Sequence, residues 1–278
     1  MLNIVEAKWL KENFDNDKLV IVDCRFSLMD KEYGKRSYDK SHIEGAVRID
    51  VETQLSSSVK KHGGRHPLPT TEELKNIFDN IGISNNSIVI AYDEGDLAGP
   101  ARLWWILKYL GHKNVYVLNG GIRAFEEIGG KITNIPNIYK KGNFHIDINE
   151  DMRVDMEYVR DRLYKDSIAI IDCRENGRYR GEFEPVDKKA GHIPSAKNYF
   201  WMNILNNTNN TLSIKSKKEL KKLFEDLNDY EEVIVYCGSG ITASPVSLAL
   251  TEINIKHKLY AGSFSDWISY EENKVDTI

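Results

Sequence analysis

The sequence has few cysteines, and they form no recognisable pattern. Cys24, Cys173 and Cys237 are the only three in 278 residues, without a CxxC pair or a zinc-type Cys/His spacing. This argues against a disulfide framework and a structural metal. No apolar stretch approaches the length of roughly 18 residues that a membrane-spanning helix needs. The start, MLNIVEAKWLKENF, predicts an amphipathic helix rather than a signal peptide. We therefore expect a cytoplasmic protein that needs no metal, cofactor or membrane.

The chain also lacks a strong charge of either sign. Its formal net charge is -4, so no general attraction to nucleic acid or to an anionic membrane is expected. Any partner has to be recognised at a local site. The length of 278 residues favours two domains, each large enough to bury a core of its own.

Internal repetition supports two domains. VIVDCR at residues 20–25 is matched by AIIDCR at 169–174, and SHIEGA at 41–46 by GHIPSA at 191–196. An offset of about 150 residues separates both pairs, as expected of a duplicated unit. The sequence therefore encodes one structural unit twice.

Each copy contains the same series of predicted elements. A capping box, Thr70 with Glu73 and Ser216 with Glu219, predicts the start of a helix. An apolar strand follows, IVIAY in the first copy and VIVY in the second, and then a glycine-containing loop and another helix. This order predicts an α/β fold of two tandem domains, each a mostly parallel central sheet flanked by helices.

The boundary between the copies is marked by a change in composition. Residues 131–150, KITNIPNIYKKGNFHIDINE, have no regular period and contain proline, glycine and asparagine. We interpret them as a linker between a domain of residues 1–130 and a domain of residues 151–278.

The two copies differ in the loop after the apolar strand, where open α/β sheets bind ligands. The first loop begins Asp93-Glu94-Gly95-Asp96, and the second begins Cys237-Gly238-Ser239-Gly240-Ile241-Thr242. Glycines let successive N–H groups turn toward one centre, and a helix from about Ala243 adds its positive end. Both effects favour a thiolate, which would make Cys237 a nucleophile.

A free cysteine at a strand end is usually one more small buried side chain. We assign Cys24 and Cys173 to the core for that reason, since they occupy equivalent strand positions in the two copies. Cys237 differs because Asp93 replaces it in the other copy and because glycines surround it. Packing alone would not require such a loop.

These residues resemble the two-domain rhodaneses, the thiosulfate and 3-mercaptopyruvate sulfurtransferases. The resemblance covers nearly the full length and includes DCR, HPLP at His66–Pro69, ARLWW at Ala101–Trp105, LNGG and the loop CGSGIT. It implies two rhodanese-like domains, of which the first, with Asp93 in place of the cysteine, is catalytically silent. The CGSGIT loop is similar to that of the mercaptopyruvate branch, whereas the thiosulfate branch has arginine and lysine after the cysteine.

The resemblance also implies a mechanism. Cys237 would attack the sulfur of 3-mercaptopyruvate, forming a persulfide and releasing pyruvate, and a serine, a histidine and an aspartate would relay a proton. Ser239 matches the serine, His42 is our candidate for the histidine, and Asp30 is a positional candidate for the aspartate. Ser239 could equally cap its turn, His42 shares its position with His192 of the other copy, and Asp30 could be a solvated loop acid.

The substrate carboxylate requires a cation. Arg178, in ENGRYRGE, matches the family's arginine, and a guanidinium suits a carboxylate. Nine residues on, Asp187 stands where the mercaptopyruvate branch has a second arginine, and the following Lys188 could supply a point charge. The other predicted substrate-binding residues belong to the loop itself: Gly238, Gly240, Ile241 and Thr242.

Three other functions compete with this one. A thiosulfate sulfurtransferase would use the same persulfide with a different donor. A cysteine phosphatase needs an arginine at the end of a longer loop, where this chain has Ala243. The third alternative is a non-enzymatic persulfide carrier or regulatory module, and a regulatory module would not require the complete loop around Cys237. For the sulfurtransferase we expect a small-molecule sulfur donor, with a thiol, thioredoxin or cyanide as acceptor.

Overall fold

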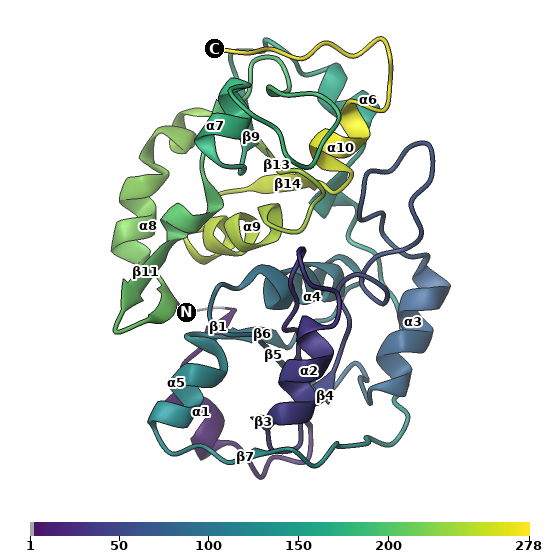
Figure 1. Ribbon diagram of the computed structural model, residues 1–278, viewed down its shortest axis with the longest axis vertical. Helices are drawn as coiled ribbons and strands as arrows, with labels where there is room; N and C mark the ends of the chain where they lie inside the picture. The colour runs from purple at the N-terminus through teal and green to yellow at the C-terminus, as the bar shows by residue number, and fades with distance from the viewer. Residues whose placement is uncertain (1–2) are drawn as a thin grey trace. The chain divides into compact units, whose positions relative to one another are not determined.

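The computed structural model describes residues 3–278, which divide into two compact units (Figure 1). Neither unit is one continuous stretch of chain. The first comprises Met1–Ser56, Pro69–Asn149 and Leu205–Ile214, and the second comprises Ser57–Leu68, Glu150–Ile204 and Lys215–Ile278. Residues 57–68 thus belong to the second unit and residues 205–214 to the first, whereas the predicted division at residues 131–150 assigns each segment to the other domain.

The first unit contains a five-stranded sheet in the order β1-β6-β5-β2-β4, in which every neighbouring pair is parallel. Two antiparallel pairs, β3 with β7 and β11 with β12, accompany it. Its elements are β1 (Ile4–Val5), α1 (Ala7–Glu12), β2 (Leu19–Asp23), α2 (Tyr33–Lys40), β3 (His42–Ile43), β4 (Val47–Arg48), α3 (Thr71–Asn80), β5 (Ile88–Tyr92), α4 (Ala98–Tyr109), β6 (Val115–Leu118), α5 (Gly121–Glu127), β7 (Ile132–Thr133), β11 (Leu205–Thr208) and β12 (Thr211–Ile214).

The second unit repeats this sheet as β8-β14-β13-β9-β10, again all parallel. The predicted α/β fold with two parallel sheets is thus confirmed. Its elements are η1 (Glu150–Met152), β8 (Arg153–Val154), α6 (Met156–Arg160), β9 (Ile168–Asp172), α7 (Asn176–Arg180), β10 (Lys197–Asn198), η2 (Trp201–Ile204), α8 (Lys217–Leu223), η3 (Glu225–Asp229), β13 (Glu232–Tyr236), α9 (Ala243–Glu252), β14 (His257–Tyr260) and α10 (Ser263–Trp267).

The predicted N-terminal helix begins later than expected. Ile4–Val5 form the edge strand β1 beside β6, and α1 starts only at Ala7. The N–H groups of Val117 and Asn119 donate to the carbonyls of Asn3 and Val5, which satisfies the edge of β6. The periodic apolar pattern from residue 1 did not distinguish this edge strand from the first helical turn.

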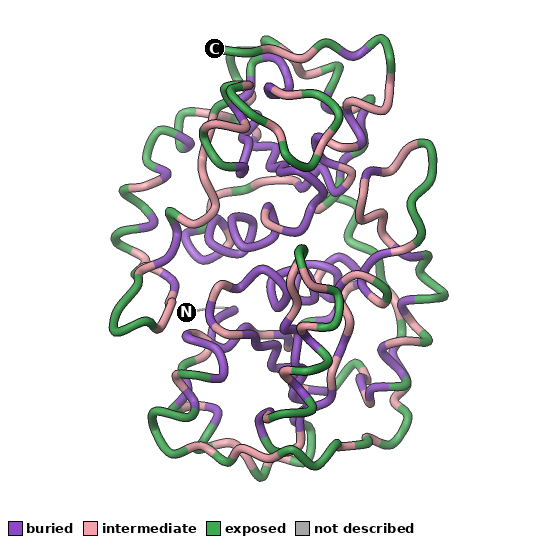
Figure 2. The backbone as a smooth tube through the Cα atoms, in the orientation of Figure 1, coloured by how far each residue is buried: buried purple, intermediate pink, exposed green. Residues whose placement is uncertain are grey.

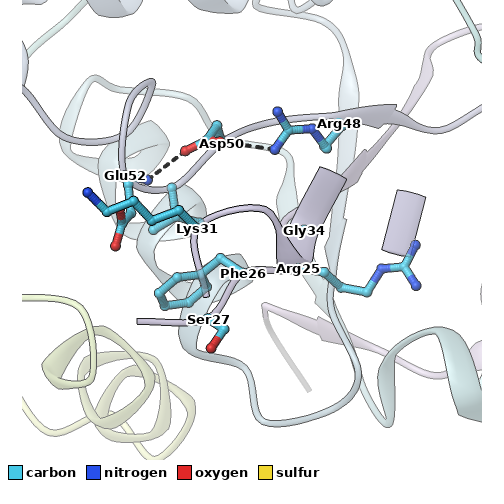
Figure 3. A pocket seen from close by; sticks show the side chains of 9 residues that line it. Arg25, Phe26, Ser27, Lys31, Gly34, Arg48, Asp50 and Glu52 are labelled. Atoms are coloured by element: carbon cyan, nitrogen blue, oxygen red, sulfur yellow. Dashed lines mark hydrogen bonds and ion pairs between the residues drawn. The ribbon is translucent and has the colours of Figure 1, made fainter. Parts of the chain in front are cut away.

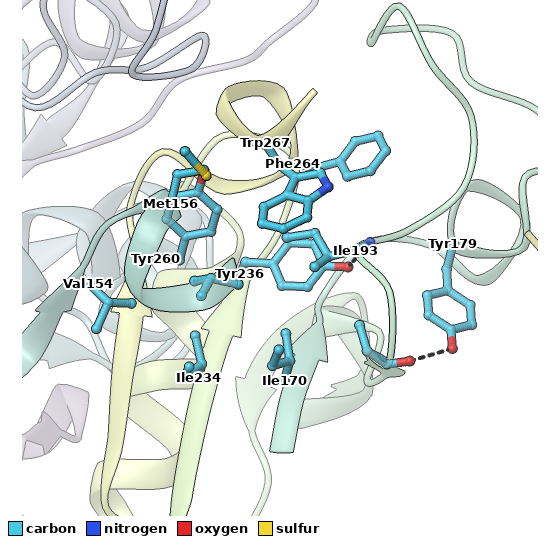
Figure 4. Packing of buried hydrophobic residues seen from close by; sticks show 12 residues of the cluster. Val154, Met156, Ile170, Tyr179, Ile193, Ile234, Tyr236, Tyr260, Phe264 and Trp267 are labelled. Carbon is cyan, nitrogen blue, oxygen red and sulfur yellow. Dashed lines mark hydrogen bonds between the residues drawn. The ribbon is translucent and has the colours of Figure 1, made fainter. Parts of the chain in front are cut away.

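The core of each unit lies on both faces of its sheet. Helices α4 and α9 are buried along most of their length, as Figure 2 shows. In the second unit, residues of β9 and β13 on one face pack against α6 and α10 (Figure 4). Strands covered on both faces read as apolar runs, which explains IVIAY and VIVY.

The predicted helix starts are confirmed. Thr70 and Ser216 accept hydrogen bonds from the backbone N–H of Glu73 and Glu219, whose side chains bond back to the capping residues. Among residues 3–278, no helix is sufficiently long and apolar to cross a bilayer.

The repeated DCR motif fixes the end of one central strand in each sheet. In the second unit Asp172 and Arg174 form a buried ion pair with an Nη2–Oδ2 distance of 2.6 Å, and Arg174 also donates to the carbonyl of Gly191. In the first unit Asp23 and Arg25 form the equivalent ion pair, and Arg25 donates to the carbonyl of Ser41. The cysteine between each pair is buried, as predicted. The motif therefore joins the strand end to the loop before the next strand, and its role is structural in both units.

Candidate active site

Cys237 follows β13 at the carboxyl end of the strand, inside the second unit. Its Sγ accepts a hydrogen bond from the N–H of Gly240 at 3.1 Å, and α9 begins at Ala243 with Thr242 as its N-cap residue. Gly240 has a φ of +81°, a conformation that suits glycine. The loop thus places the Gly240 N–H on the sulfur and begins α9 a few residues beyond it.

Residues of α10 bind the backbone of the Cys237 loop. The N–H groups of Phe264 and Ser265 donate to the carbonyls of Cys237 and Gly238, both at 2.9 Å. Ser263 accepts from the Cys237 N–H at 3.2 Å. Three backbone groups of the loop are therefore fixed, and the position of the sulfur is set by the fold.

Two guanidinium groups lie against Gly238. A Cβ at this position would meet Arg65 Nη2 at 2.9 Å and Arg178 Nη2 at 3.6 Å. A side chain at position 238 would therefore push against the Arg65 guanidinium. Arg178 was predicted from the sequence, and the second guanidinium belongs to Arg65, which the sequence analysis did not single out.

Each arginine also faces a carboxylate. Arg178 binds Glu184 through Nε at 2.9 and 3.0 Å, and its Nη2 lies 3.0 Å from Asp187 Oδ2. Arg65 Nη1 pairs with the other oxygen of Asp187. Burial lowers the pKa of Arg65 from its usual value, and the nearby Cys237 offsets only part of this shift. Lys188, the predicted alternative cation, is exposed to solvent.

Ser239 forms a hydrogen bond with a histidine that follows Arg65. His66 Nδ1 and Ser239 Oγ are 2.7 Å apart, and Ser239 is 5% exposed. His66 lies in the HPLP stretch that carries part of the family resemblance. That stretch was therefore the available signal for this residue.

The segment that carries Arg65 and His66 is held on the second unit by α10 and the turn after it. The N–H of Gly63 donates to Asp266 Oδ1 at 2.6 Å, and the N–H of Arg65 donates to Ser265 Oγ at 3.0 Å. His62 stacks on Tyr270 with ring centroids 4.1 Å apart. These contacts explain why residues 57–68 belong to the second unit although they precede its sheet by about 100 residues.

The structure places the other predicted relay residues in the first unit. His42 Nδ1 lies 2.7 Å from the carbonyl oxygen of Tyr38, and its Nε2 lies 3.1 Å from the carbonyl oxygen of Ile135. His192 makes the equivalent bond to Tyr179 in the second unit, so this histidine joins backbone segments in both copies. Asp30 is exposed and ion-paired with Arg36. The structure thus brings Cys237, Ser239 and Arg178 together with Arg65 and His66, and it gives His42 and Asp30 other partners.

In the first unit the equivalent loop contains a buried acid. Asp93 Oδ1 accepts from the Gly95 N–H at 2.6 Å, and Oδ2 has no hydrogen-bond partner among the described residues. Burial, reinforced by the neighbouring Asp96, holds the pKa of Asp93 well above its usual value. This loop therefore has neither a nucleophile nor a charge that could attract an anion.

Asp93→Asn should stabilise the protein in a pH-dependent way. Because folding raises the pKa of Asp93, its ionisation costs stability once the pH exceeds the unfolded-state pKa of about 4. We expect the variant to gain about 1–2 kcal/mol in free energy of unfolding at pH 7 and nothing near pH 3. Unfolding curves at several pH values test this. Asp17→Asn, on an exposed turn of the same unit, should have no effect, and an equal gain at every pH for Asp93→Asn would contradict the assignment.

A small pocket beside Arg25 in the first unit offers no alternative site (Figure 3). Its volume is about 10 Å³, room for about one water molecule. Asp50 lies within it and accepts from Arg48 at 3.1 Å and from the N–H of Glu52 at 3.0 Å. The polar side chains that line the pocket are thus bonded to one another, and the pocket is too small for a sulfur donor.

Comparison with known proteins agrees with this geometry. The model of the rhodanese-like domain matches residues 6–128 and 155–270, once in each unit. The chain belongs to the rhodanese family. Its match to the "Probable 3-mercaptopyruvate sulfurtransferase" of Pseudomonas aeruginosa is 35% identical and covers 99% of this chain and 98% of the relative.

Other relatives extend over similar lengths. The thiosulfate sulfurtransferase of Rattus norvegicus is 29% identical, covering 95% of this chain and 91% of the relative. The crystal structure of SseA from Escherichia coli, one of the 3-mercaptopyruvate sulfotransferases, superposes with a TM-score of 0.83 at 28% identity, covering 95% of this chain and 100% of that one. This rhodanese is therefore an enzyme of the sulfurtransferase class.

Proposed function

We propose that this rhodanese takes sulfur from 3-mercaptopyruvate, holds it as a persulfide on Cys237 and passes it to a thiol, thioredoxin or cyanide. The observation that carries the proposal is the pair of guanidinium groups, Arg65 and Arg178, lying against the loop of Cys237. A planar guanidinium pair suits one carboxylate, and the nucleophile lies next to it. The loop residues Gly238, Gly240, Ile241 and Thr242 would contact the donor through their backbone.

In the first half-reaction the Cys237 thiolate attacks the donor sulfur. The new S–S bond forms as the S–C bond breaks, and the electron pair of that bond stays on the carbon as the enolate of pyruvate. The enolate takes up a proton and leaves as pyruvate. In the second half-reaction the acceptor attacks the outer sulfur of the persulfide, and the Cys237 thiolate is regenerated.

Ser239 and His66 are our candidates for supplying the proton to the enolate. The hydroxyl lies two residues from the nucleophile and is hydrogen-bonded to the imidazole at 2.7 Å. This pair takes the role that the sequence analysis gave to Ser239 with His42. The contacts of His42 with Tyr38 and Ile135 favour a structural role for it instead.

His66→Gln should lower kcat with 3-mercaptopyruvate by about a hundredfold and leave KM nearly unchanged, because the lost function is proton transfer. Steady-state pyruvate release as a function of pH measures this. His62→Gln is the matched control, since it lies on the same segment and contacts Ser269 and Tyr270. If both variants lose the same activity, the effect belongs to the segment and not to His66.

Thiosulfate is the second candidate donor. Two adjacent guanidinium groups would also attract a dianion, and a rat relative carries that name. Asp187 and Glu184, however, place two negative charges beside the two arginines, which disfavours a dianion more than a monoanion. Side-by-side measurement of kcat/KM for the two donors tests the proposal. We expect 3-mercaptopyruvate to be preferred, and a preference for thiosulfate would overturn the donor assignment.

A further inference from the structure

The carboxylate of Asp187 pairs with both arginines to which the donor binding is assigned above. One oxygen pairs with Arg65, and the other lies 3.0 Å from Arg178 Nη2. The side chain is 2% exposed, so its charge is withdrawn from solvent and neutralised by the two arginines. A bridging carboxylate between two guanidinium groups is the arrangement that a substrate carboxylate would itself adopt.

The neighbouring acid, Glu184, has a different role. It binds Arg178 and, through Oε2, Arg174 Nη1 at 3.3 Å. Its Oε1 also accepts from the N–H groups of Val186 and Asp187, both at 3.0 Å. Glu184 therefore anchors the turn from inside, and Asp187 is the residue that the turn presents to the arginine pair.

The backbone of Val186 and Asp187 is bonded to Glu184, but most side chains of this turn face solvent. Pro185, Val186, Lys188 and Lys189 are exposed, so the turn has solvent on its outer side. A displacement of Asp187 from the arginine pair would therefore move exposed residues and not the core. The Arg178 guanidinium keeps Glu184 as a partner when Asp187 moves, and the backbone of Arg65 stays hydrogen-bonded to Ser265.

We propose that Asp187 is a specificity-determining residue, an internal carboxylate that occupies the arginine pair in the resting enzyme and is exchanged for the carboxylate of the donor. This inference rests on the proposed role of Arg65 and Arg178 as donor ligands. Exchange leaves the number of charges beside Cys237 unchanged when the incoming group is a monoanion. It also returns Asp187 to the arginines when pyruvate leaves, which prevents the product from occupying the site. Asp187 thus does not stand in for the missing second arginine of the family pattern; it weakens anion binding at the pair that Arg65 completes.

Asp187→Asn tests this because it keeps the shape of the side chain and removes its charge. We expect KM for 3-mercaptopyruvate and the inhibition constant for pyruvate both to fall about tenfold, since the arginines lose their competing anion. KM for thiosulfate should fall by a larger factor, because a dianion gains more from the removed charge. The matched control is Glu182→Gln, an exposed acid of the same turn that pairs with Arg180, and its constants should stay within about twofold of the parent.

Stability gives a second readout that does not depend on turnover. Asp187→Asn removes the negative charge between two arginines, so the thermal midpoint of the variant should be lower than that of the parent. Pyruvate should raise the midpoint of the variant more than it raises that of the parent enzyme. Calorimetric titration of pyruvate into Cys237→Ser with and without Asp187→Asn then compares binding in the absence of chemistry. An affinity that rises about tenfold supports the inference.

The outcomes separate this inference from the proposed function. If pyruvate binds no tighter after Asp187→Asn and neither KM nor the inhibition constant falls, Asp187 is only a structural partner of the arginines and the inference is wrong. If pyruvate binds more tightly but 3-mercaptopyruvate is not turned over by any form of the enzyme, the arginine pair and Asp187 behave as inferred and the proposed donor is wrong.

Discussion

Replacing Cys237 with serine abolishes sulfur transfer, with an expected loss in kcat of more than about a thousandfold. A hydroxyl in the same place is not ionised at neutral pH and cannot carry a sulfane sulfur. The substitution changes one atom, and the contacts of the loop with Ser263, Phe264 and Ser265 involve backbone groups of residues 237 and 238. The variant should therefore fold normally, and pyruvate release and thiocyanate formation measure the loss.

Cys173→Ser is the matched control for this prediction. Cys173 lies in the same unit at the end of β9, and burial raises the pKa of its thiol well above the usual value. It should therefore remain a thiol, and its replacement should leave kcat within about twofold of the parent. Residual activity in Cys237→Ser together with a loss in Cys173→Ser would reverse the assignment of the nucleophile.

Removing either arginine of the pair weakens binding of a carboxylate donor. We expect Arg178→Gln and Arg65→Gln each to raise KM for 3-mercaptopyruvate by about 10- to 100-fold, with a smaller change in kcat, because each loses charge-assisted hydrogen bonds to the donor. The double variant should be less than additive, since both groups bind the same carboxylate. Steady-state kinetics at fixed acceptor concentration measure the effects.

Arg180→Gln controls for a general loss of positive charge near the turn. Arg180 lies two residues from Arg178 on α7, is exposed and pairs with Glu182. Its replacement should leave KM within about twofold. If Arg178→Gln lowers the thermal midpoint but leaves KM unchanged, the arginine only anchors Glu184 and the donor carboxylate binds elsewhere.

The features that the sequence predicted are those determined by local pattern. Apolar runs placed β5 and β13, capping boxes placed the starts of α3 and α8, and the internal repeat identified two copies of one fold. The comparison of Asp93 with Cys237 then identified the loop that carries the thiol. Each of these signals lies within a few consecutive residues, where composition and periodicity are informative.

The features that were missed depend on contacts between distant parts of the chain. Arg65 and His66 reach the loop of Cys237 because Asp266 and Ser265 hold their segment, about 200 residues away in sequence. No periodicity encodes such a pairing. The resemblance included the HPLP stretch without a role for His66, and the predicted relay histidine was His42 of the repeated motif. Repetition in both copies is better evidence for a structural role, as His42 and His192 illustrate.

The most direct test of this account is the mass of the enzyme after incubation with 3-mercaptopyruvate in the absence of an acceptor, followed by mapping of the modified peptide. We expect one added sulfur atom per chain, located on Cys237, which disappears when a thiol or cyanide is added. Pyruvate release without added sulfur, or added sulfur on Cys24 or Cys173, would contradict it.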